Sequence, residues 1–213
     1  MSPPDRRAVL TGLVASLGGP ALAAIVPDDP RLKTATVRQT VSPGRTLAMY
    51  LAVPARARGR HPAMLVVHDA AGLDEPAREA AREVALLGFV ACAPDFLTRL
   101  SGTPADARAA RIMMARLDTT EALHDATGAL SWLARNPPGE RVLTGKVGAL
   151  GLGWGGTLVE RLAVAAPDEI GAAITVGAPE AAVLADSLPW LRLKTADEPA
   201  WARAGPFLKE HFR

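Results

Sequence analysis

The sequence contains one cysteine, four histidines and only 4% aromatic residues in a chain of 213. A lone cysteine, Cys92, cannot form an intramolecular disulfide, so the fold must be held together by its core. No pair of histidines has metal-ligand spacing, which argues against a zinc site. The net charge of +2 is spread over interspersed Arg and acidic residues, without a basic patch or an aromatic ladder. Nucleic-acid binding, metal binding and a cofactor are therefore not expected.

A long apolar run is also missing. The most apolar stretch near the N-terminus, residues 8–17, is interrupted by glycine and falls short of the roughly 20 residues that a membrane span needs. Two arginines precede it and a small-residue segment ending at Ala23 follows, a pattern typical of a twin-arginine export signal. We predict that residues 1–23 are such a signal and that the mature chain is periplasmic. A short membrane anchor is the weaker alternative.

A chain of 213 residues that is 49% hydrophobic suits one substantial core, so the remaining chain, residues 34–213, is predicted to be a single α/β domain. Strand-like and helix-like segments alternate, which is typical of a mostly parallel sheet covered by helices on both faces. The first two strands are expected to form an antiparallel pair at one edge of the sheet. The pattern predicts strands over 36–41, 47–53, 63–67, 89–93, 147–152, 172–176 and 191–193, and helices between Asp74 and Gly88, over 104–136 with a break near 118–120, and over 201–212.

The most informative segment is KVGALGLGWGGTL, residues 146–158, in which an apolar strand meets a glycine-rich turn and then a helix. This arrangement matches the strained turn that lifts a nucleophile above the sheet of a hydrolase, with small residues on either side. The nucleophile position holds Gly153, which has no side chain for attack. A plain anion-binding turn at a helix start is the alternative. Neither a P-loop nor a GxGxxG motif fits, so a nucleotide site is not expected.

Three stretches in order resemble the dienelactone hydrolase family: HPAMLVVHDAAGL at 61–73, GFVACAPDFLTR at 88–99 and KVGALGLGWGG at 146–156. The resemblance implies an α/β-hydrolase fold and the cleavage of esters or lactones by a Cys-His-Asp triad. It places the Cys at Gly153 and the triad Asp at Asp197. Only 16 residues follow Asp197, without the further strand and loop that carry the family's His. The chain is therefore expected to be shorter than the family at its C-terminus.

The resemblance also assigns roles around the turn. Asp69 corresponds to an acidic residue, usually Glu, that contacts the resting Cys, and Arg99 to an arginine that in some members holds a substrate carboxylate. An exposed loop residue is the alternative for Arg99. The residues implied to form the turn and the oxyanion site are Gly151, Trp154, Gly155 and Ala70.

Other residues with reactive side chains have simpler interpretations. His211 lies in the terminal helical segment and is expected to cap that helix, because triad order and geometry both argue against it. His68, at a strand end, is expected to hydrogen-bond the neighbouring loop. Cys92 lies within an apolar strand and is expected to be an inert core residue, since a buried thiol is normally unreactive.

The combined prediction is an exported protein of the ester and lactone hydrolase class that has lost catalysis and retains affinity for a small carboxylate, ester or lactone. The alternative is a weak hydrolase in which Asp69 or Asp197 activates water without a histidine. A third hypothesis is a fragment with an exposed sheet edge, which would fold poorly.

Overall fold

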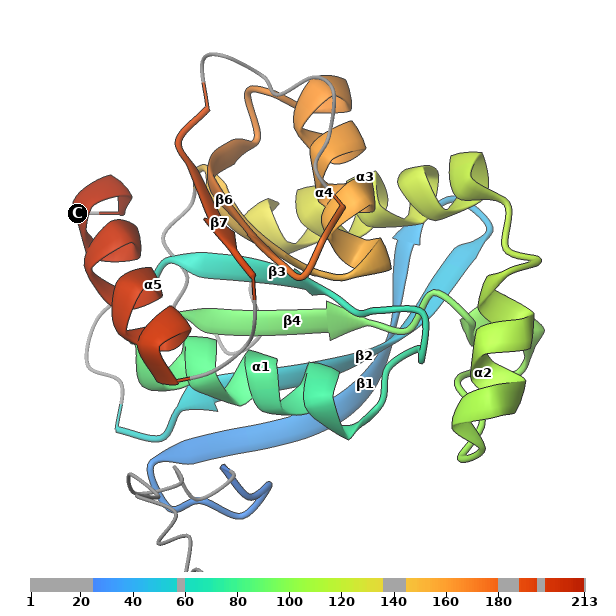
Figure 1. Ribbon diagram of the computed structural model, residues 1–213, viewed down its shortest axis with the longest axis horizontal. Coiled ribbons are helices and arrows are strands. Elements are labelled where there is room, and N and C mark those ends of the chain that lie inside the picture. The colour runs from blue at the N-terminus through green and yellow to red at the C-terminus, as the bar shows by residue number, and fades with distance from the viewer. Residues whose placement is uncertain (1–24, 57–59, 136–144, 180–187, 195–197, 213) are drawn as a thin grey trace, which may run out of the picture.

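The computed structural model describes residues 25–56, 60–135, 145–179, 188–194 and 198–212. These residues form one seven-stranded sheet in the order β1-β2-β4-β3-β5-β6-β7 (Figure 1). The strands are β1 (Leu32–Ser42), β2 (Arg45–Pro54), β3 (Ala63–Val67), β4 (Val90–Pro94), β5 (Val147–Leu152), β6 (Ile170–Val176) and β7 (Trp190–Leu193).

The sheet is mixed, as predicted. β1 pairs with β2 and β2 with β4 in antiparallel orientation, so the N-terminal hairpin forms one edge. From β4 to β7 all neighbouring strands are parallel. The two central strands, β3 and β5, are apolar and buried almost throughout, because helices cover both of their faces.

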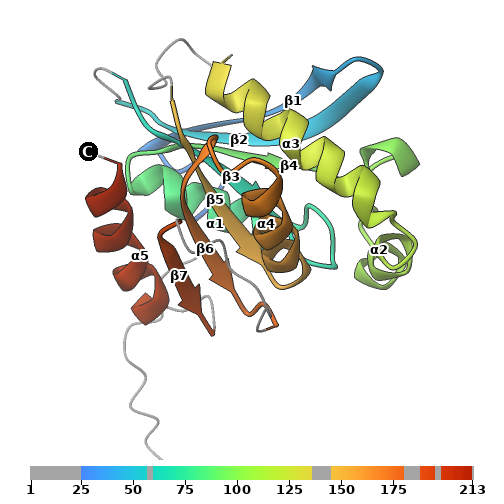
Figure 2. The ribbon, with the colours of Figure 1, turned by 90° about the horizontal axis from the view of Figure 1, so that it is seen from above.

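Helices cover the two faces of the sheet in separate layers (Figure 2). α3 and α4 pack on one face, around core residues such as Leu130 and Leu162, and α1 and α5 pack on the other, around residues such as Val84 and Leu208. α2 and the short 3-10 helix η1 lie beyond the carboxyl end of β4 (Figure 1). The helices are α1 (Glu75–Leu86), η1 (Thr98–Leu100), α2 (Ala107–Met114), α3 (Thr119–Arg135), α4 (Trp154–Ala165) and α5 (Glu198–His211).

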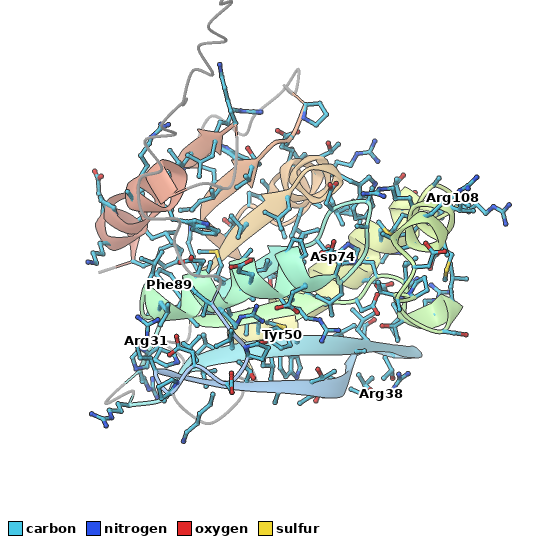
Figure 3. The ribbon with its side chains drawn as sticks, turned by 60° about the horizontal axis from the view of Figure 1, so that its bottom comes forward. Arg31, Arg38, Tyr50, Asp74, Phe89 and Arg108 are labelled. Carbon is cyan, nitrogen blue, oxygen red and sulfur yellow. The ribbon has the colours of Figure 1, made fainter. Side chains whose placement is uncertain are left out.

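Helix α1 shows how local sequence sets an element. Asp74 caps its start by accepting a hydrogen bond from the Ala77 N–H at 3.1 Å, as predicted. Further along, the buried Arg82 donates to the Tyr50 hydroxyl of β2 at 3.1 Å and pairs with Glu75. Figure 3 shows Asp74 at the start of α1 and Tyr50 beside the helix, on the strand side. A buried guanidinium needs such partners, since an unpaired one would be costly.

The fold brings three connections to one edge of the sheet, at the carboxyl ends of the parallel strands. They follow β3 (residues 68–74), β4 (residues 95–103) and β5 (Gly153). Open α/β sheets bind ligands at this edge. The residues that the sequence singles out around the glycine-rich turn are therefore brought together by the order of the strands.

Candidate functional site

The turn between β5 and α4, residues 151–156, is called the elbow here. Gly153 has φ +48° and ψ −112°, a backbone conformation that residues other than glycine rarely adopt. Its N–H donates to the Val176 carbonyl at 2.8 Å, and its own carbonyl accepts from the Gly156 N–H at 3.0 Å. The backbone of a nucleophile turn is thus present with glycine at its centre.

The other elbow glycines are required by packing. A Cβ on Gly151 would lie 2.5 Å from the Gly155 carbonyl oxygen, and one on Gly155 would lie 2.4 Å from the Val67 carbonyl oxygen. A Cβ on Gly156 would lie 2.4 Å from the Cβ of Ala178. The start of α4 therefore lies directly against the ends of β3 and β5, which only glycine permits.

Asp69 lies at the elbow and contacts it directly. The Trp154 N–H, at the first residue of α4, donates to Asp69 Oδ1 at 2.8 Å. Gly153 gives the helix no side-chain cap, so the Asp69 carboxylate satisfies an N–H that would otherwise lack a partner. A negative group is also favoured at this end of a helix by the macrodipole. The acidic residue that the sequence singled out thus lies beside Gly153, where the resemblance places the nucleophile.

His68 holds the main chain of Asp69 in place. The Phe96 N–H donates to His68 Nε2 at 3.2 Å, which leaves Nδ1 to carry the proton and donate it to the Asp69 carbonyl oxygen at 2.8 Å. The ring is fully buried, and this desolvation lowers the pKa of His68 below its usual value. His68 is therefore a neutral residue that fixes the loop backbone, in agreement with its predicted structural role.

Three ring side chains, those of His68, Phe96 and Trp154, pack together at the elbow. The His68 ring meets Phe96 edge to face with centroids 5.3 Å apart, and it stacks against Trp154 at 6.1 Å. Phe96 and Trp154 are also in edge contact at 6.1 Å. The sequence analysis assigned no role to Phe96, although it directly follows the Pro-Asp pair of the family-like motif. These three rings join the connections that follow β3, β4 and β5.

Asp95, the acid of that motif, organises the connection after β4. Its carboxylate accepts from the Leu97 N–H at 2.9 Å, from the Thr103 N–H at 2.8 Å and from the Thr103 hydroxyl at 2.8 Å. Thr103 Oγ1 in turn accepts from the Leu73 N–H at 2.9 Å. The network ties residues 95–103 to the loop that carries Asp69. It was missed because its partners come from separate loops.

Arg99 lies in η1, and its side chain is 52% exposed. It pairs with Glu121 on α3, which also pairs with Arg45 of β2. Hydrogen bonds from Arg99 and Arg45 lower the pKa of the Glu121 carboxyl. The positive charge of Arg99 is thus engaged by an acidic partner of its own chain, and its predicted role in carboxylate binding stays a prediction.

The remaining predicted site residues fall into two groups. Ala70 is half-buried in the turn after Asp69, whose carbonyl also accepts from the Gly72 N–H at 2.9 Å. Asp197, the predicted triad acid, lies outside the described residues, as does the predicted export signal.

All four histidines of the chain lie within the described residues. His211 ends α5, and the adjacent Phe212 ring lies against Gly148 and Gly171, near the starts of β5 and β6. Gly153 follows the opposite end of β5, so His211 is at the wrong edge of the sheet for a triad. His68 has both ring nitrogens engaged with backbone groups. Of the other two, His61 bonds the Gly88 carbonyl ahead of β3, and His124 is exposed on α3.

Cys92 is fully buried in β4, with its sulfur 3.4 Å from that of Met49. Burial raises the pKa of the thiol well above its usual value, so the reactive thiolate is not formed near neutral pH. This confirms the predicted core role. Within the described part of the chain, no three His, Cys, Asp or Glu side chains are grouped to hold a metal, and no helix is long and apolar enough to cross a bilayer.

Comparison with known proteins identifies the family. The profile of the "Dienelactone hydrolase family" matches residues 47–186, well over half of the sequence. The chain belongs to the dienelactone hydrolase family. A hydrolase fragment of Escherichia coli K12, YghX, is 38% identical over 71 residues, which are 33% of this chain and 61% of that protein. The chain thus spans less than two thirds of that relative's length.

Solved structures show the fold of this dienelactone hydrolase family member. A dienelactone hydrolase-like promiscuous phosphotriesterase from metagenomic libraries superposes with a TM-score of 0.68 at 20% identity, covering 86% of this chain and all of the other. A structure named m3DLH superposes with a TM-score of 0.59 at 24% identity, covering 85% of this chain and 78% of the other. At these identities the likeness establishes the α/β-hydrolase-like fold alone.

Proposed function

We propose that this chain is an exported, non-catalytic member of the dienelactone hydrolase family. The observation that carries the proposal is the elbow itself, whose strained backbone is intact around a residue without a side chain. Covalent catalysis needs a nucleophile there and a base that activates it. Gly153 supplies no nucleophile, and His68, the histidine that stacks on Trp154 of the elbow, has both ring nitrogens engaged with backbone groups.

The hydrogen bonding of the elbow also argues against residual catalysis. Triad enzymes that lose one member keep about 10³- to 10⁴-fold acceleration over water, through the oxyanion hole and binding. Here the Trp154 N–H, which follows the nucleophile position and would serve the oxyanion, already donates to Asp69. A developing oxyanion would have to displace a carboxylate of its own charge. The ligand that we propose for this edge is a small neutral ester or lactone, as the family implies, bound without turnover.

A weak hydrolase is the second candidate, because Asp69 is exposed and lies where a nucleophile or its water would be. In that case the carboxylate would act as a general base on water. The two candidates make opposite predictions about Asp69, so one set of variants separates them.

The test is hydrolysis of p-nitrophenyl acetate and of a dienelactone by the purified protein and its Asp69→Ala, Asp197→Ala and Asp106→Ala variants. Asp106 accepts hydrogen bonds from the Arg108 and Ala109 N–H groups at the start of α2 and serves as the purification-matched control. We expect rates equal to the buffer blank for all four proteins, with circular dichroism confirming that they are folded. Turnover that disappears in Asp69→Ala or Asp197→Ala but persists in Asp106→Ala would instead establish the weak hydrolase.

Export is tested separately, by mass spectrometry of the chain recovered from the periplasm of an expressing bacterium. We expect a polypeptide that begins at residue 24, and we expect both cleavage and export to be abolished when Arg6 and Arg7 are replaced by lysine. Full-length chain that stays in the cytoplasm with the arginines intact would refute this part of the proposal and leave the non-catalytic part standing.

A further inference from the structure

The space for a side chain at position 153 is already filled. A Cβ built on Gly153 would lie 2.2 Å from Asp69 Oδ1, 2.5 Å from its Cγ and 2.8 Å from its Oδ2, whereas real Cβ contacts essentially never fall below 3.0 Å. All three atoms of the Asp69 carboxyl group thus lie within 2.8 Å of the position that a Cβ of residue 153 would take. Any residue other than glycine at this position must move that group.

The main chain of Asp69 has little freedom to move. Its carbonyl oxygen accepts from His68 Nδ1 at 2.8 Å and from the Gly72 N–H at 2.9 Å, and its carboxylate accepts from the Trp154 N–H at 2.8 Å. The main chain is therefore fixed by a buried ring and by a turn, and only rotation of the short side chain can relieve an overlap. That rotation would break the bond to Trp154 and leave the N–H at the start of α4 without its partner.

We propose that Asp69 is an internal ligand of the elbow, which takes both the space of the absent side chain and the hydrogen bond of the Trp154 N–H. Residues 69 and 153 then form a coupled pair, so that restoring a nucleophile at Gly153 alone does not restore an accessible one. The inference rests on the proposed non-catalytic function and deepens it. Two residues would then prevent nucleophilic attack at the elbow: Gly153, which has no side chain, and Asp69, which fills the space of one.

The first test is a double-mutant cycle on thermal stability, with Gly153→Ala, Asp69→Ala and the double variant. The backbone strain of an alanine at φ +48° is the same in both backgrounds, so the cycle isolates the interaction with Asp69. We expect Gly153→Ala to lower Tm by about 3 °C or more beyond its effect in the Asp69→Ala background. Gly44→Ala, at φ +72° with no atom within 4 Å, is the matched control and should be additive with Asp69→Ala.

The second test reads the site chemically, through the rate at which Gly153→Cys reacts with a disulfide reagent at neutral pH. A thiol at a helix start has a low pKa and reacts quickly, whereas a neighbouring carboxylate opposes the thiolate and shields it. We expect labelling to be roughly tenfold faster in Asp69→Ala than with Asp69 present. Asp69→Asn, similar in size but uncharged, should give an intermediate rate, and the wild type, with only the buried Cys92, is the blank.

Additive Tm shifts or equal labelling rates in the two backgrounds would overturn the proposal. Folding of Gly153→Cys only in the Asp69→Ala background would support it, and if Gly153→Cys folds in neither, the alanine cycle decides. Neither readout depends on ester turnover. Failure of this inference is therefore distinguishable from failure of the proposed function, which the wild-type rate alone would reveal.

Discussion

At the scale of single residues, the elbow glycines illustrate how packing constrains a motif. Gly151 lies at the end of a central strand, where a Cβ would overlap the backbone of Gly155 at 2.5 Å and of Gly156 at 2.5 Å. No side-chain rotation can relieve an overlap between backbone atoms. A side chain at position 151 therefore destabilises the turn, whichever residue stands at position 153.

We accordingly expect Gly151→Ala to lower the free energy of unfolding by about 3 kcal/mol, through overpacking of the elbow. Gly44→Ala is the comparison, because it introduces positive-φ strain of about 1 kcal/mol in open space. Urea unfolding followed by circular dichroism measures both. A loss for Gly151→Ala no larger than that for Gly44→Ala would show that the elbow can relax, and that its glycines are not needed for packing.

At the scale of elements, the sequence predicted most of the sheet because its strands carry simple signals. β3 and β5 coincide with the predicted ranges 63–67 and 147–152, since both are continuous apolar runs between turn-forming residues. β1 is longer than predicted and begins at Leu32 in place of residue 36. The added residues include the exposed, polar Lys33 and the polar Thr34, which an edge strand that faces solvent tolerates.

The candidate site was predictable only in part at this scale. The elbow is contiguous in sequence, so its glycine spacing could be recognised directly. The bond between Trp154 and Asp69 joins residues 85 positions apart and exists because β3 pairs with β5, Val67 opposite Gly151. The pairing of Arg99 with Glu121 depends on how α3 lies over the hairpin, which no local pattern encodes. The sequence therefore identified Asp69 and Arg99, but it did not predict which side chains or backbone groups they contact, because those contacts are set by packing.

At the scale of the whole molecule, the buried His68 links the pH of the solution to the stability of the fold. Burial lowers its pKa in the folded state below the unfolded value of 6.5. Its contribution to stability is therefore fully present above pH 6.5, and it is lost as the pH falls below that value, because the unfolded chain gains a proton that the folded chain does not. Glu83 has the opposite sign, since burial and the neighbouring Glu79 raise its pKa above 4.5.

We expect the free energy of unfolding to fall below pH 6.5 with a slope of up to about 1.4 kcal/mol per pH unit for the single proton on His68. His68→Asn, which keeps a donor for the Asp69 carbonyl, should be less stable overall and should lack this component of the slope. Glu83 is unchanged in both proteins, so its contribution cancels in the comparison. Urea unfolding from pH 5.0 to 7.5 measures the slopes, with the exposed His124→Asn as the control. Parallel curves for the wild type and His68→Asn would mean that His68 takes up its proton alike in the folded and unfolded chains, so that its Nε2 does not remain the acceptor for the Phe96 N–H at low pH.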